Sequence, residues 1–165
     1  MIDHLLILEG LDGTGKTTTA SKLIQFSTHT LPIHYVYFPK KETPQMTYDY
    51  FYDLTNSFKY LDGIVIMDRS ILSTYAYSFD TVDYLRLFSL VKEYDPLVVY
   101  FDKVYDKSKL VSDWERIKKR YERGIDFLIE TLQIPVIISD AETFIKFVNS
   151  LDRLQKLLKE KRFPV

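Results

Sequence analysis

Short apolar runs alternate with longer amphipathic stretches along the whole chain. In the amphipathic stretches the apolar residues recur three or four positions apart, which is typical of helices, whereas the short apolar runs are typical of buried strands. Five such runs occur, at residues 5–9, 34–38, 64–68, 96–101 and 135–138. This alternation predicts an α/β fold, a parallel five-stranded sheet with helices on both faces. Ligands of such sheets bind beyond the carboxyl ends of the strands, so the residues that follow strands are the candidates for function.

Composition supports one compact domain over residues 1–165 and narrows its partners. The chain is 46% apolar and 27% charged, with a net charge of -1 and no cysteine. The near balance of charge predicts no nucleic-acid partner, because such partners require a basic surface. No basic-then-apolar leader opens the sequence and no apolar run approaches twenty residues, so we expect a cytoplasmic protein without membrane contact.

A glycine-rich loop joins the first predicted strand to the first predicted helix. Residues 10–17, "GLDGTGKT", fit the pattern G-x-x-x-x-G-K-[ST]. Glycines let backbone N–H groups converge on phosphate oxygens, and the following helix adds its positive end. By this logic Lys16 reaches the β- and γ-phosphates and the Thr17 hydroxyl binds Mg²⁺. The alternative is an ordinary glycine-rich turn with a surface lysine.

A second polar segment, "DRSILSTYAYS" at residues 68–78, follows the third predicted strand. Its Arg69 can form paired hydrogen bonds to a phosphate and remains charged at any relevant pH. The helix after it carries Ser73 and Tyr77. The alternative is a surface ion pair that caps a helix, with Tyr77 in the core.

With these two segments in place, the sequence resembles the thymidylate kinase family of P-loop nucleoside-monophosphate kinases. "EGLDGTGKTT" is similar to the first signature of that family, and "DRSILSTYAYS" to its Asp-Arg-x-x-x-Ser-x-x-Ala-Tyr signature with the same spacing. "FPKKET" at residues 38–43 resembles the family segment Phe-Pro-Glu-Arg-Ser-Thr. Weaker similarity continues through "WERIKKRYERG" and "PVIISDAET". The resemblance implies a P-loop kinase fold with a short lid.

The resemblance also implies a reaction, in which ATP donates its γ-phosphoryl group to a deoxynucleoside monophosphate, with dTMP or a related pyrimidine nucleotide as the expected acceptor. Mg²⁺ would be the cofactor, with Thr17 and Asp68 as its candidate protein ligands, and the family implies a homodimer. Asp68 would hold either Arg69 or a metal-bound water. The candidate ATP-binding residues are Gly10, Gly13, Thr14, Gly15, Lys16, Thr17 and Thr18.

For the acceptor, the resemblance implies a set of residues that surround its phosphate, sugar and base. Arg69 would bind the phosphate, and Lys41 occupies the position of a phosphate-binding arginine in the family. Asp12 would assist the sugar or the metal, and Tyr77 would pack beside the sugar and base. The candidate acceptor-binding residues are Asp12, Lys41, Phe51, Arg69, Ser73 and Tyr77, and the candidate catalytic residues are Lys16, Arg69, Asp12 and Arg116.

The sequence departs from the family at the lid. Family members carry an arginine that completes the charge clamp, either inside the glycine loop or in a lid after the fourth strand. Here the loop has Gly13, and the candidate lid at residues 103–112 contains lysines but no arginine. Arg116, the first of three arginines spaced along the next helix, is our candidate to swing over the phosphates. The alternative is that these arginines form a solvated helix face.

A second departure concerns the acceptor base. The segment between the second and third strands is short, and its helix carries several aromatic residues but no arginine. Such aromatics are typical of a core, and Phe51 is our candidate to stack on a base. We therefore expect pyrimidine selectivity that is broader than, or different from, that of the family.

Three other functions remain open from the sequence. A deoxynucleoside kinase acts on a 5′-hydroxyl and requires a carboxylate base, for which Glu42 is the candidate. A catalytically weak nucleotide-binding relative would bind ATP without transfer. A nucleic-acid-dependent ATPase is disfavoured by the net charge and by Arg69, which stands where a second acidic residue would be expected.

Overall fold

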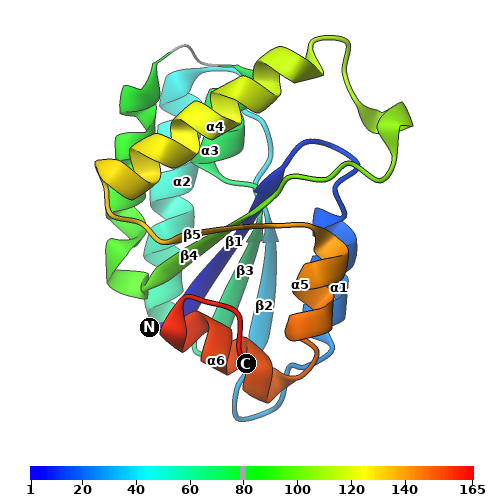
Figure 1. Ribbon diagram of the computed structural model, residues 1–165. Coiled ribbons are helices and arrows are strands. Elements are labelled where there is room, and N and C mark those ends of the chain that lie inside the picture. The colour runs from blue at the N-terminus through cyan, green and yellow to red at the C-terminus, as the bar shows by residue number, and fades with distance from the viewer. Residues whose placement is uncertain (79–80) are drawn as a thin grey trace.

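The computed structural model describes residues 1–78 and 81–165, and its centre is the predicted parallel sheet (Figure 1). The strands lie in the order β2-β3-β1-β4-β5, and each neighbouring pair is parallel. The strands end within about two residues of the predicted positions. Their bounds are β1 His4–Gly10, β2 Ile33–Tyr37, β3 Ile64–Asp68, β4 Pro96–Phe101 and β5 Val136–Ser139.

Helices cover both faces of the sheet, as predicted. The α2, α3 and α4 helices pack on one face together with a segment of 3₁₀ turns, and α1, α5 and α6 pack on the other (Figure 1). The 3₁₀ segments are Phe58–Tyr60, Val82–Tyr94 and Lys107–Lys109. The α-helices are α1 Lys16–Ile24, α2 Pro44–Ser57, α3 Ile71–Tyr77, α4 Trp114–Glu130, α5 Ala141–Phe147 and α6 Leu151–Glu160.

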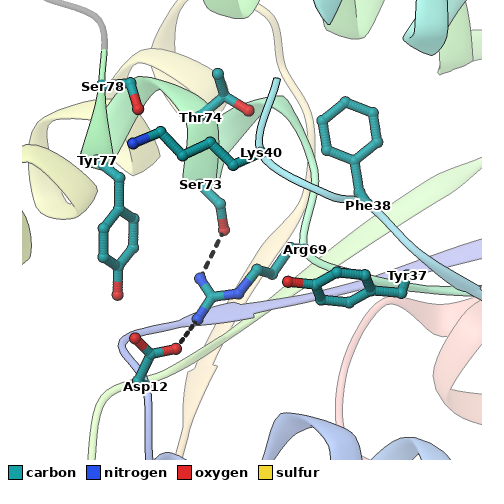
Figure 2. A pocket seen from close by; sticks show the side chains of 9 residues that line it. All are labelled: Asp12, Tyr37, Phe38, Lys40, Arg69, Ser73, Thr74, Tyr77 and Ser78. Carbon is teal, nitrogen blue, oxygen red and sulfur yellow. Dashed lines mark hydrogen bonds and ion pairs between the residues drawn. The ribbon is translucent and has the colours of Figure 1, made fainter. Parts of the chain in front are cut away.

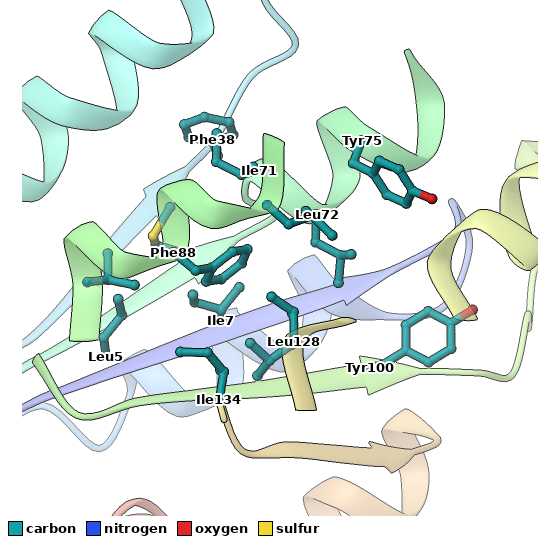
Figure 3. Close-up of a cluster of buried hydrophobic side chains, with 14 of the residues drawn as sticks. Leu5, Ile7, Phe38, Ile71, Leu72, Tyr75, Phe88, Tyr100, Leu128 and Ile134 are labelled. Atoms are coloured by element: carbon teal, nitrogen blue, oxygen red, sulfur yellow. The ribbon is translucent and has the colours of Figure 1, made fainter. Parts of the chain in front are cut away.

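The alternation of side chains along β1 divides the core into two parts. Leu5 and Ile7 join the cluster beneath α2, α3 and α4, which Figure 3 shows, whereas Leu6 and Leu8 join the cluster beneath α1, α5 and α6. All four side chains are fully buried. Because β1 is central and covered on both faces, its sequence is continuously apolar rather than alternating.

The parallel register brings the polar ends of the strands together. Leu8 of β1 pairs with Asp68 of β3, and Gly10 pairs with Phe101 of β4. The glycine loop (residues 10–17), Arg69 and the lid (residues 103–112) therefore leave the same edge of the sheet. Within the described residues, no helix is both long and apolar enough to cross a membrane.

Candidate active site

The glycine loop closes around the side chain of its own lysine. Gly13 and Gly15 have φ angles of 82° and 90°, the left-handed region that glycine adopts without strain. The buried Lys16 Nζ donates to the carbonyl oxygens of Gly10 at 2.9 Å and Leu11 at 2.7 Å. Burial, and then the nearby charge of Arg69, lower the pKa of Lys16 to about 8. The buried ammonium group of Lys16 is thus held by backbone carbonyls of the loop itself.

Thr17 and Asp68, the two predicted metal ligands, lie together. The Thr17 hydroxyl donates to Asp68 Oδ2 at 2.7 Å, and the Tyr35 hydroxyl donates to the same oxygen at 2.7 Å. Burial and this hydrogen bond raise the pKa of Tyr35 to about 12. A hydroxyl and a carboxylate beside a phosphate loop are oxygen ligands of the kind that Mg²⁺ takes, with water and phosphate completing its shell. The residues fit the cofactor.

Arg69 projects from the end of β3 into a cavity beside the glycine loop (Figure 2). Its backbone is left-handed, with a φ of 72°, which is uncommon for a residue with a side chain. Nη2 forms an ion pair with Asp12, and Nη1 donates to the Ser73 hydroxyl at 3.1 Å. The guanidinium carbon lies 5.3 Å from the centre of the Tyr77 ring. Asp68 is therefore not the partner of Arg69, because Asp12 fills that place and Asp68 holds Thr17.

Glu9, which the sequence analysis overlooked, is a fully buried carboxylate at the end of β1. It accepts hydrogen bonds from the Ser70 hydroxyl at 2.7 Å, the Ser73 N–H at 3.0 Å and the Ser73 hydroxyl. Burial raises the pKa of Glu9, while these hydrogen bonds oppose the rise. An acidic residue inside a strand followed by two serines in the next motif was the only signal available.

The first cavity, which we call the acceptor cavity, has a volume of about 180 Å³. The structure brings four of the six predicted acceptor-binding residues together in it. Its lining residues are Asp12, Tyr37, Phe38, Lys40, Arg69, Ser73, Thr74, Tyr77 and Ser78 (Figure 2).

The other two predicted acceptor residues, Lys41 and Phe51, do not line this cavity. Lys41 turns to α2, where its Nζ lies 4.3 Å from the centre of the Tyr50 ring. Phe51 is fully buried against Phe38 at 5.7 Å between ring centres, so the expectation that it stacks on a base is wrong. The cavity instead receives Lys40, which neighbours Lys41, and Phe38. The sequence motif located the segment but not the direction of each side chain.

A second cavity, the phosphate cavity, has a volume of about 430 Å³ and lies over the glycine loop. It shares Asp12, Tyr37 and Arg69 with the acceptor cavity, so the two hollows meet at these residues. The remaining lining residues are Gly13, Gly15, Lys16, Thr17, Thr18, Asp68 and Lys109. Of the seven predicted ATP-binding residues, Gly10 and Thr14 lie beneath this surface, where Thr14 Oγ1 donates to the Leu11 carbonyl at 2.8 Å.

The lid rests directly on the glycine loop. The Tyr105 and Asp106 N–H groups donate to the Gly13 carbonyl at 2.8 and 3.3 Å. Lys109, from the same lid, lines both the phosphate cavity and a third cavity of about 580 Å³ between the lid and α5. The lid therefore brings one cation to the phosphate cavity, and that cation is a lysine.

Arg116, the arginine predicted to swing over the phosphates, lies outside these three cavities. Its side chain is 58% exposed and forms an ion pair with Asp113 at 2.6 Å in the first turn of α4. Arg120 turns to α3, where it donates to the carbonyls of Tyr75 and Ala76 at 2.6 and 3.0 Å. The structure thus does not place Arg116 at the site, because its guanidinium is paired with Asp113 at the solvent-exposed start of α4.

Comparisons with known proteins agree with this architecture. No protein-family model matches the chain. A protein of Acidianus bottle-shaped virus (isolate Italy/Pozzuoli), described as "Putative thymidylate kinase", is 38% identical over 124 residues, which cover 69% of this chain and 79% of that protein. The crystal structure of the YorR protein of Bacillus subtilis, in complex with phosphorylated GDP, has a TM-score of 0.55 at 20% identity. It covers 97% of this chain and 99% of YorR, and it supports the fold.

Proposed function

Because the chain belongs to the thymidylate kinase family, we propose that it transfers the γ-phosphoryl group of ATP to a deoxynucleoside monophosphate, dTMP or a related pyrimidine nucleotide. One observation carries the proposal. Two cavities meet at Asp12, Tyr37 and Arg69, one of them over the glycine loop and the other over α3. A donor and an acceptor bound in these cavities would face each other across Arg69, as a direct transfer between nucleotides requires.

The phosphate cavity supplies the donor side. Lys16 would exchange its contacts with the Gly10 and Leu11 carbonyls for oxygens of the β- and γ-phosphates. Thr17 and Asp68 would hold Mg²⁺, which when bound neutralises phosphate charge. Tyr35 fixes Asp68 by donating to its Oδ2. The Tyr35 hydroxyl keeps this proton at neutral pH, as any tyrosine does, and its raised pKa extends the protonated form to more alkaline pH.

The acceptor cavity favours a ligand that already carries a phosphate. Arg69 and Lys40 place two cations on its wall. Phe38, Thr74 and Ser78 offer an apolar ring and two hydroxyls to the rest of the acceptor. A phosphate oxygen attacks without losing a proton, so the reaction requires positioning and positive charge rather than a general base. These features separate the proposal from a deoxynucleoside kinase, because Glu42, the candidate base, is exposed and does not line the cavity.

Transfer would then occur between Lys16 on the donor side and Arg69 on the acceptor side. Both cations contact the phosphoryl oxygens where charge develops in the transition state. Lys109 approaches the same cavity from the lid and would complete the clamp in place of the arginine that the lid lacks. Closure of the lid excludes water, which protects the donor from hydrolysis.

The proposal is tested by an acceptor panel read as ADP release. Purified protein with ATP and Mg²⁺ is offered dTMP, dUMP, dCMP, dAMP and dGMP separately, with thymidine as the hydroxyl acceptor and Lys16→Met as the inactive control. We expect release with at least one pyrimidine monophosphate and none with thymidine. Release with thymidine alone would identify a deoxynucleoside kinase. ATP binding without release for any acceptor would show a non-catalytic nucleotide-binding protein.

A further inference from the structure

Two fully buried polar side chains, Glu9 and Tyr121, lie beneath the candidate site without facing either cavity. Glu9 is the penultimate residue of β1, and Tyr121 lies in the middle of α4, more than a hundred residues further along the chain. Burying a carboxylate and a phenol is costly unless both are hydrogen-bonded. The hydrogen-bond partners of Glu9 and Tyr121 therefore indicate their role, and both sets of hydrogen bonds lead to Arg69.

Glu9 determines how Ser73 uses its single hydroxyl proton. Each Glu9 contact comes from a donor, since Ser70 and Ser73 give it two hydroxyls and one N–H. The Ser73 hydroxyl proton is thus committed to the carboxylate, which leaves its oxygen lone pairs free to accept. Arg69 Nη1, a donor only, fills this position at 3.1 Å.

Tyr121 provides a second hydrogen-bond acceptor for the Arg69 guanidinium. Its hydroxyl lies 2.8 Å from Ser73 Oγ, and it donates to the Gly10 carbonyl at 3.2 Å. Arg69 Nη1 in turn donates to the Tyr121 oxygen at 3.2 Å and to the Gly10 carbonyl at 3.3 Å. Burial raises the pKa of Tyr121 well above its ordinary value, so its hydroxyl remains protonated. Nη1 is therefore surrounded by acceptors from α3, α4 and the glycine loop.

We infer that Glu9, acting through Ser73, and Tyr121, which contacts Arg69 directly, are positioning residues that fix Arg69 so that its Nη2 edge faces the acceptor phosphate. The inference rests on the proposed function for the identity of the ligand, a phosphate monoester. An arginine side chain is flexible, and here the exposed Asp12 competes for its head group. Anchoring Nη1 from beneath leaves Nη2 at the cavity, where a phosphate can replace the Asp12 carboxylate.

The kinetic test removes one hydroxyl while keeping the ring. Tyr121→Phe retains the ring packing against Tyr77 and Tyr100, whose ring centres lie 6.1 and 5.3 Å away. We expect the KM for the active monophosphate to rise about tenfold, the effect of one lost hydrogen bond to a charged group. The KM for ATP should stay within about twofold, because the loop lysine keeps its own carbonyl partners.

Tyr100→Phe is the matched control. Tyr100 is a nearly buried tyrosine of the same cluster, and its hydroxyl forms no hydrogen bond with any residue that the structure describes. The control should leave both KM values and kcat unchanged. Equal changes of both KM values in Tyr121→Phe, or no change in either, would overturn the inference.

A second measurement does not depend on catalysis. In protein labelled with [15N]arginine and free of nucleotide, hindered rotation should give Arg69 separate Nη1 and Nη2 resonances, assigned by their loss in Arg69→Lys. Tyr121→Phe and Glu9→Gln should merge or broaden them, while Tyr100→Phe should not. Separate resonances that persist in both variants would refute the positioning role. An inactive protein with the expected spectra would instead refute the proposed function and leave the positioning role standing.

Discussion

At the scale of single residues, side-chain direction determines which of two adjacent lysines lines the acceptor cavity. Lys40 lines the acceptor cavity, whereas Lys41 lies over the Tyr50 ring of α2. The segment after β2 is not helical, so neighbouring side chains leave it in different directions. The lysine of this segment that lines the acceptor cavity is therefore Lys40, one position earlier than the family motif indicates.

This assignment predicts different effects for two identical substitutions. Lys40→Ala should raise the KM for the monophosphate acceptor about tenfold, because a charged hydrogen bond to phosphate is lost. Lys41→Ala should change it by less than about twofold, since Lys41 does not line the cavity and its partly exposed contact with the Tyr50 ring contributes little. Steady-state kinetics with varied acceptor and saturating ATP make the comparison. A larger rise in the acceptor KM for Lys41→Ala than for Lys40→Ala would show that Lys41, not Lys40, contacts the phosphate.

At the scale of elements, the short lid carries a lysine, Lys109, at the phosphate cavity and contains no arginine. The lid is held to the glycine loop through the Gly13 carbonyl, and its Lys109 reaches the phosphate cavity. The first turn of α4, which holds Arg116, is tied instead to Asp113. A lysine supplies charge without the paired geometry of a guanidinium, so we expect the proposed Lys109 contact to hold the phosphoryl group less rigidly than an arginine would.

The position of Lys109 predicts that three substitutions in and after the lid lower kcat to different extents. Lys109→Ala should lower kcat about ten- to a hundredfold, because a cation is lost from the transferring phosphoryl group. Lys107→Ala is the matched control, since this lid lysine lines a separate hollow with Leu110 and Trp114. Arg116→Ala should leave kcat within about twofold. A large loss in Arg116→Ala with none in Lys109→Ala would show that the first turn of α4 rearranges to supply the clamp.

The strands and helices along the chain could be predicted from local sequence patterns. The cavity or core that each side chain faces could not be predicted in this way. Apolar runs and glycine positions locate the strands and the loop because burial and left-handed backbone conformations restrict which residues can stand there. Phe51 was misassigned because an aromatic residue on an amphipathic helix looks the same whether it faces a core or a ligand. Glu9 was missed because its partners in α3 lie more than sixty residues away. Such contacts depend on tertiary packing, which one sequence does not reveal.

At the scale of the whole molecule, burial of the Lys16 cation lowers the free energy of unfolding. Lys16 is only 6% exposed, and its pKa falls from an ordinary 10.5 to about 8 through burial and then through the charge of Arg69. The folded chain therefore disfavours the charged lysine that phosphate binding requires. Stability at the loop is lower than packing alone would give, as at many functional sites.

This cost predicts a pH-dependent difference between the wild type and Lys16→Met. Between pH 8 and 10.5 the unfolded chain keeps the Lys16 proton that the folded chain has lost, so wild-type stability rises with pH relative to the variant. The total gain is on the order of 3 kcal/mol, and the difference should be constant below about pH 7. Urea unfolding of both proteins from pH 6 to 10.5 measures it, with Lys22→Met as the exposed control on α1. Parallel stability curves for wild type and Lys16→Met would contradict the lowered pKa.

The contact between lid and loop also limits where this protein can carry an arginine near the phosphate cavity. A Cβ atom at Gly13 would lie 2.4 Å from the Asp106 carbonyl oxygen, and the φ of 82° adds strain for any side chain. A docked lid and an arginine at position 13 are therefore mutually exclusive in this fold. Changing the donor of the clamp charge from lid to loop would require two coordinated changes, the loss of the docked lid and the gain of the arginine. We expect either change alone to lower activity, because a side chain at position 13 would meet the docked lid and an undocked lid would withdraw Lys109.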